Sequence, residues 1–138
     1  MIKILCLGKI KEPYLNALIA DYQKRISKYH PLEIIELKDT GNIEEEKRSL
    51  LKHISSKDYV ITLEIEGERL TSEAFASKIE KTFIYYPNIT FVIGSSLGLH
   101  PDIKKISNFA LSFSSLTFPH GLFRGILLEQ IYRAFKII

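Results

Sequence analysis

The stretch Gly94-Ser95-Ser96-Leu97-Gly98 matches the G-x-S-x-G pattern of serine hydrolases, in which the middle serine is the nucleophile at a sharp turn between a strand and a helix. Here that serine would be Ser96, and Asp102 and His120 follow it in the usual chain order of a triad. However, Pro101 places the helix start several residues after the turn, and Asp102 is too close to Ser96 to come from a separate strand end. A serine hydrolase therefore stays a remote alternative, beside a plain glycine-bearing turn without a ligand.

A second set of reactive side chains lies on the last predicted helix, which follows Pro119 and is otherwise apolar. It carries Arg124, Glu129, Gln130, Arg133 and Lys136. At 3.6 residues per turn, the last four share one sector, and Arg124 projects almost opposite Arg133. Glu129 and Arg133 are spaced for an ion pair on the helix surface, or for a role in catalysis. Since one protomer's sheet covers only one side of a helix, the apolar circumference predicts a partner protomer.

Other kinds of site are not indicated. The chain has no GxGxxG or GxxxxGK[ST] phosphate-binding pattern and no His, Cys or carboxylate cluster at metal spacing. Its single cysteine, Cys6, excludes an internal disulfide and, within an apolar run, is expected to be a core residue. The formal charge of +3 leaves nucleic acid open as a partner.

Composition predicts one soluble globular domain over residues 1–138, with 46% hydrophobic and 25% charged residues. No apolar run approaches the roughly 20 residues that span a bilayer. The N-terminal run MIKILCLGKIKEPY returns to charged residues without a cleavage site, so we expect no signal peptide and a cytoplasmic location.

The elements that must position these residues alternate between strands and helices, which predicts an α/β fold with a mostly parallel sheet flanked by helices. Strands are predicted at 2–8, 32–38, 58–67 (ended by Gly67), 88–94 and 109–114. Helices are predicted at 14–29, from about 43, at 71–83 (capped by Thr71 or Ser72), from Pro101 and after Pro119.

Ligands of such sheets bind outside the carboxyl ends of the strands. Two of these ends are rich in Gly, Ser and Thr and poor in charge: GSSLGLHP after the fourth strand and SSLTFPHG after the fifth. They suit a neutral or zwitterionic ligand that is held by backbone groups.

Several stretches together resemble the RlmH (YbeA) family of SPOUT methyltransferases over nearly the whole chain. They are TFVIGSSLGL, ALSFSSLTFPH, LLEQIYRAFKII, MIKILCLGKIKEPY and VITLEIEGERLTSEAFA. The resemblance implies a SPOUT-type α/β fold with a C-terminal trefoil knot, and a homodimer. It also implies transfer of a methyl group from S-adenosyl-L-methionine (SAM) to N3 of a pseudouridine in the 23S rRNA of the large ribosomal subunit.

Site residues follow from the same resemblance. The implied cofactor-binding residues are Leu63, Gly94, Phe113, Ser114, Ser115, Leu116, Thr117 and Phe118. Leu63, Leu116 and Phe118 offer apolar surface, and Gly94 would let the chain approach the ligand closely. The catalytic candidates are Glu129 and Arg133, followed by His120 and Arg124, and Lys9 and Lys11 are expected to contact the RNA backbone.

This chain departs from the family pattern in three places. Gly94-Ser95 stands where the family usually has two glycines, and the connection before the third strand is short. Family members continue past the last helix with a tail of Gly, Pro, Tyr and His, whereas this sequence stops at Ile138. The alternative is therefore a tail-less dimer that binds SAM or RNA with impaired catalysis, or a purely structural dimerisation module.

Overall fold

Five strands form one sheet in the order β2-β1-β4-β3-β5, and every neighbouring pair is parallel. The computed structural model describes all residues from 1 to 138. The strands are β1 (Ile2–Leu7), β2 (Leu32–Leu37), β3 (Asp58–Arg69), β4 (Asn88–Ile93) and β5 (Phe109–Ser112). The helices are α1 (Pro13–Ser27), α2 (Ile43–Leu51), α3 (Ser72–Tyr85), α4 (Pro101–Ile106) and α5 (His120–Ile137). None of these helices combines the length and apolar character needed to cross a bilayer. The predicted mostly parallel α/β fold is confirmed.

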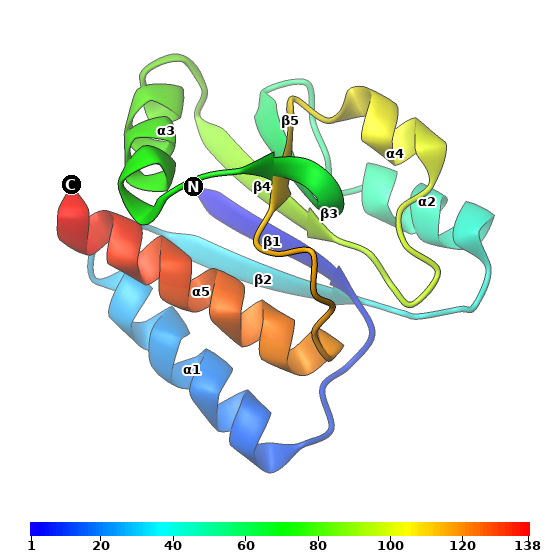
Figure 1. Cartoon of the computed structure of the whole chain (residues 1–138). Coiled ribbons are helices and arrows are strands. Elements are labelled where there is room, and N and C mark those ends of the chain that lie inside the picture. The colour runs from blue at the N-terminus through cyan, green and yellow to red at the C-terminus, as the bar shows by residue number, and fades with distance from the viewer.

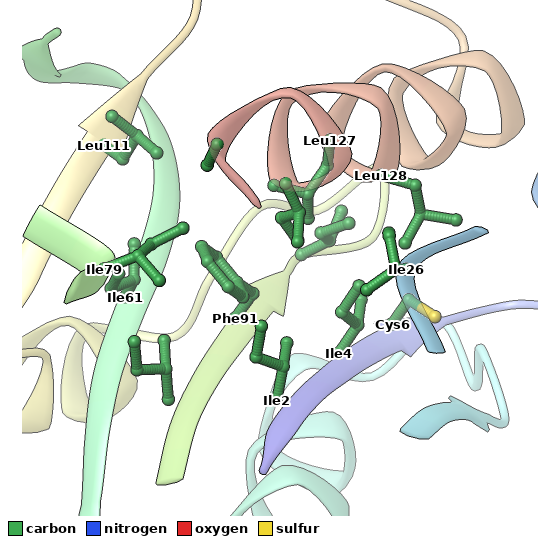
Figure 2. Close-up of a cluster of buried hydrophobic side chains, with 14 of the residues drawn as sticks. Ile2, Ile4, Cys6, Ile26, Ile61, Ile79, Phe91, Leu111, Leu127 and Leu128 are labelled. Carbon is green, nitrogen blue, oxygen red and sulfur yellow. The ribbon is translucent and has the colours of Figure 1, made fainter. Parts of the chain in front are cut away.

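Side-chain alternation along the strands creates two apolar layers. Ile2, Ile4 and Cys6 face the core formed with α1, α3 and α5, whereas Leu5 and Leu7 face the core formed with α2 and α4. Figure 2 shows Ile4 and Cys6 of β1 beneath side chains of α5. Cys6 is fully buried, which confirms the prediction of a core residue, and this burial raises the pKa of its thiol to about 11.

The third strand does not end at Gly67, as the sequence predicted, but continues to Arg69. A side chain at Gly67 would lie 2.7 Å from the carbonyl oxygen of Ala110, so glycine here permits close contact between β3 and β5. Leu111 pairs with both Leu63 and Glu68, so the residues between them bulge out of the ladder. This glycine serves the strand instead of terminating it.

The last helix, α5, lies between α1 and α3 on one face of the sheet (Figure 1). Its residues Leu127, Leu128, Ile131 and Ala134 are all buried within the protomer. Neighbouring helices thus cover much of α5 within one protomer, whereas Leu122, Ile137 and Ile138 stay exposed, so the partner protomer stays a prediction. The trefoil knot that the resemblance implied for this segment stays a prediction.

A buried polar network closes the amino-terminal end of the sheet. The Asp58 carboxylate lies 2.8 Å from Lys3 Nζ and accepts hydrogen bonds from the Ser55 backbone (3.1 Å), Asn88 (2.9 Å) and Thr90 (3.0 Å). Burial opposes ionisation of Asp58, but the hydrogen bonds from Lys3, Ser55 and Asn88 outweigh it and lower its pKa to about 2. This end of the sheet therefore has a fully occupied carboxylate.

Candidate cofactor cavity

A cavity of about 510 Å³ lies at the carboxyl ends of β3, β4 and β5. Seven of the eight predicted cofactor residues line it: Leu63, Gly94, Phe113, Ser114, Leu116, Thr117 and Phe118. The eighth, Ser115, is exposed outside the lining, and its hydroxyl accepts a hydrogen bond from Arg69. The structure thus brings together two loops and one strand end that are far apart in the sequence.

The β5–α5 loop is fixed at its ends and open in its middle. Phe113 and Phe118 both contact the ring of Phe123 on α5, with centroids 5.3 and 5.9 Å away. Within the loop, the Leu116 backbone donates a hydrogen bond to Ser114 Oγ (3.0 Å), and the Leu116 side chain is 73% exposed. This arrangement leaves backbone groups and apolar surface available to a ligand.

The β4–α4 loop folds tightly on itself. A side chain at Gly94 would lie 2.8 Å from the backbone of Gly98, which itself has a φ of +79°. Ser95 and Gly98 also form an isolated antiparallel bridge. Gly94 was expected to allow close approach of a ligand, whereas the neighbour that requires a glycine here is the loop itself.

The buried carboxylate of Glu46 holds this loop from below. Ser95 Oγ donates a hydrogen bond to Glu46 Oε1 (2.8 Å) and accepts one from the Leu97 backbone (3.2 Å). Glu46 is only 1% exposed, and its second oxygen has no hydrogen-bond partner. The sequence analysis missed this residue, although its spacing of four from the buried Leu50 would have indicated the inner face of α2.

The bulged part of β3 forms a wall of the cavity that the sequence analysis also missed, since it named only Leu63 there. Glu64, Ile65 and Glu66 line it. The Glu64 carboxylate accepts a hydrogen bond from Thr62 Oγ1 (2.6 Å) and lies 3.8 Å from Lys104 Nζ, which also lines the cavity. The wall is therefore acidic, with one lysine beside it.

Of the four catalytic candidates, only His120 lines the cavity. Arg124 is 2% exposed, and its guanidinium donates hydrogen bonds to Glu36 (2.6 Å) and to the Gly8 carbonyl (3.2 Å). It therefore connects α5 to the ends of β1 and β2 inside the protomer. The prediction of Arg124 as a catalytic group of this cavity is not supported by its position.

Glu129 and Arg133 form the ion pair that their spacing allows. Arg133 donates a hydrogen bond to Glu129 (2.7 Å), which raises the arginine's pKa, and Gln130 donates another to the same carboxylate (3.0 Å). With a rise of 1.5 Å per residue, Arg133 lies roughly 20 Å along α5 from His120. Neither residue of the pair lines the cavity of its own protomer.

The hydrolase alternative lacks its geometry. Ser96 makes no hydrogen bond to His120 or Asp102, and Asp102 instead contacts Lys47 at 3.2 Å. No residue other than glycine has a positive φ, so Ser96 lacks the strained turn of a nucleophile. No group of three or more His, Cys, Asp or Glu side chains is placed to hold a metal ion.

Comparison with known proteins identifies the family. The family described as "Predicted SPOUT methyltransferase" matches residues 1–138. The chain is 49% identical over 150 residues to a Methanococcus maripaludis protein, with 99% of this chain and 94% of that protein covered. It is 47% identical over 149 residues to the ribosomal RNA large subunit methyltransferase H of Streptococcus uberis, with the same coverage.

A solved structure shows the same fold at low sequence identity. The SpoU methyltransferase AviRb of Streptomyces viridochromogenes, solved with its cofactor AdoMet, superimposes with a TM-score of 0.51 and 8% identity. The match covers 95% of this chain but 56% of AviRb. On the full-length match and the identities above, the chain belongs to the SPOUT methyltransferase family, among the ribosomal RNA large subunit methyltransferase H proteins.

Proposed function

We propose that this protein is a SAM-dependent methyltransferase that modifies N3 of a pseudouridine in the 23S rRNA of the large ribosomal subunit, and that it works as a homodimer. The observation that carries the proposal is the cavity at the carboxyl ends of β3, β4 and β5, which lies where α/β proteins bind ligands. Relatives of this chain are named as ribosomal RNA large subunit methyltransferases, and the structure of AviRb was solved with AdoMet.

The residues present fit this cofactor. A volume of about 510 Å³ falls in the range of roughly 300–1,000 Å³ that is usual for small-molecule sites. Leu63, Leu116 and Phe118 would pack against the adenine, and backbone groups of the two loops would bind its polar edge. Carboxylates of Glu64 and Glu66 would favour the positive charges of SAM. When bound, SAM supplies a methyl group on a sulfonium, which is already activated for displacement.

The protein's own contribution is to position the base and to receive a proton. N3 of the base carries a hydrogen and becomes nucleophilic when that proton leaves. His120 lies in the cavity lining at the start of α5 and can accept the proton, while Lys104 on the same cavity can stabilise the resulting anion. The remaining acceleration would come from holding base and methyl group in line.

Arg133 and Glu129 can take part in this reaction only if they reach the cavity of a partner protomer in a homodimer. Neither residue lines its own protomer's cavity, and Arg133 lies roughly 20 Å along α5 from His120. If α5 of one protomer lies against the partner's site, Arg133 would orient RNA there and Glu129 would fix the guanidinium. Lys9 and Lys11, which are exposed just after β1, stay predicted contacts to the RNA backbone.

The test is methyl transfer from labelled SAM to ribosomes purified from cells that lack this protein. We expect the label in the large-subunit rRNA, at a pseudouridine, and a strong loss of transfer with His120→Ala. SAM binding without transfer by the full-length protein would contradict the proposal and favour the binding-only dimer.

A further inference from the structure

A groove lies between α3 and the edge of the sheet formed by β3 and β5. Its volume is about 460 Å³. Four aromatic rings and two lysines dominate its lining: Tyr59, Tyr85, Tyr86, Phe109, Lys78 and Lys81. The only carboxylate in the lining is Glu68, so the groove carries a net positive charge.

The groove is linked to the cofactor cavity by a smaller hollow of about 260 Å³. That hollow shares Phe113 and Phe118 with the cofactor cavity, and it shares Leu70 with the groove. The three hollows therefore follow one another around the start of α3. A chain-like ligand whose end occupied the cofactor cavity could continue along this path.

The two lysines of the groove have no carboxylate partner, and Lys81 and Tyr85 are exposed to solvent. Neither Lys78 nor Lys81 forms an ion pair with a carboxylate, and Lys78 Nζ lies 4.0 Å from the centre of the Phe109 ring. The Tyr59 and Tyr86 rings meet edge to face with centroids 5.2 Å apart. Tyr85 is 82% exposed, so its aromatic face is available to stack on a ligand.

We propose that this groove, which we call the α3 groove, binds a single-stranded segment of the RNA substrate next to the target nucleotide. The inference rests on the proposed function, since it assigns an RNA path to that enzyme. Cations spaced along a groove neutralise phosphates, and exposed rings stack on bases, which together bind single strands with little sequence preference. Lys78 and Lys81 bind phosphates, and Tyr85 stacks on a base.

The test compares two pairs of charge removals. In the groove variant, Lys78→Ala and Lys81→Ala are combined. In the control, Arg48→Ala on α2 and Lys52→Ala just after it are combined, both at exposed positions. Binding of a fluorescent ten-nucleotide uridine-rich RNA is measured by anisotropy at several salt concentrations. We expect the groove variant to weaken binding about tenfold and to lower the salt slope by roughly 1.4, while the control changes neither.

Kinetics then separate the groove from the reaction. The groove variant and Tyr85→Ala should each raise KM for ribosomes about tenfold, with kcat and the calorimetric Kd for SAM unchanged. Lys78→Arg with Lys81→Arg should restore RNA binding, because it restores the charge. Unchanged RNA binding and KM in the groove variant would overturn the α3 groove and leave the proposed function standing.

Two other results also decide the matter. If the groove variant loses its dimer in sedimentation, the groove is a protein interface and the RNA proposal is wrong. If the unsubstituted protein transfers no methyl group, the proposed function fails, and the anisotropy comparison alone decides whether the groove binds RNA.

Discussion

At the amino-terminal ends of the strands, Asp58 pairs with Lys3 of β1 and accepts hydrogen bonds from Ser55 and from β4. At the carboxyl ends, the loop polar groups instead mostly contact their own loop. Asp58 is buried and fully used, with its pKa lowered to about 2. In the β5–α5 loop, by contrast, Leu116 and Thr117 are exposed. One end is stabilised by its own contacts, and the other keeps groups available for a ligand.

The two ends of the sheet should therefore tolerate substitutions differently. The fold loses stability when any hydrogen-bond partner of a buried carboxylate is removed, because the charge is then less well compensated. A loop that is held only at its ends loses binding before it loses the fold. Substitutions at the two ends should therefore affect different measurements.

The largest effect is expected at the carboxyl end, from Gly94→Val. The new side chain would collide with the backbone of Gly98 and displace the β4–α4 loop from the cavity. SAM binding should fall by more than about a hundredfold in calorimetry, while circular dichroism shows a retained fold. An unchanged SAM affinity would remove this loop from the site.

The next largest effect is expected from a double variant that tests whether Arg133 acts at the cavity at the carboxyl ends of the strands. The double variant Arg133→Glu with Glu129→Arg keeps the attraction between the two residues, so the melting temperature should shift by no more than about 2 °C. Methyl transfer to ribosomes should nevertheless drop by about a hundredfold, because a positive group that faces RNA becomes negative.

Full activity in the charge-swapped protein would assign the pair to the helix surface alone. Sedimentation of the unsubstituted protein is the companion measurement, since a stable monomer would leave Arg133 without a cavity to reach. Sedimentation is preferable to a charged substitution on α5 such as Ile131→Glu, because Ile131 is buried within the protomer and a charge there would destabilise the fold itself.

A smaller effect is expected at the amino-terminal end on acidification. The pKa of Asp58 is lowered from 3.8 to about 2, so its contribution to stability is present above pH 3.8 and is lost as the pH falls toward 2. The total loss in free energy of unfolding, measured with urea from neutral pH to below pH 2, should be on the order of 2 kcal/mol. Asp58→Asn should be less stable at neutral pH and show a flatter profile below pH 4. An identical slope in both proteins would contradict the assignment.

The smallest effect is expected from Ser95, whose hydrogen bond to Glu46 holds the β4–α4 loop in place. Ser95→Ala removes the single hydrogen bond to the buried Glu46 and should lower stability by about 1 kcal/mol. It should also weaken SAM binding several-fold, because the β4–α4 loop loses its support. Combining Ser95→Ala with Glu46→Gln should recover part of the stability, since the glutamine amide removes a buried carboxylate oxygen that has no hydrogen-bond partner. If each change lowered stability independently, the two residues would not be coupled.

The sequence by itself determined the order and type of the ten elements. Apolar runs, Pro13 and Pro101 at helix starts and the Thr71 cap all act locally, so they can be read from neighbouring residues. The resemblance added the two loops of the cavity, because those stretches carry the family's motifs. Seven of eight cofactor positions that it implied lie around one hollow.

Only the tertiary structure decided how distant residues meet. Arg124 pairs with Glu36 across 88 positions of the chain, and Ser95 meets Glu46 across 49, and no local pattern announces either contact. The bulge that places Glu64 on the cavity depends on the register of β5 against β3. Distance along α5 likewise separated Arg133 from the cavity. Local periodicity fixes which face of an element is buried, but the partner on that face depends on how the whole chain is arranged.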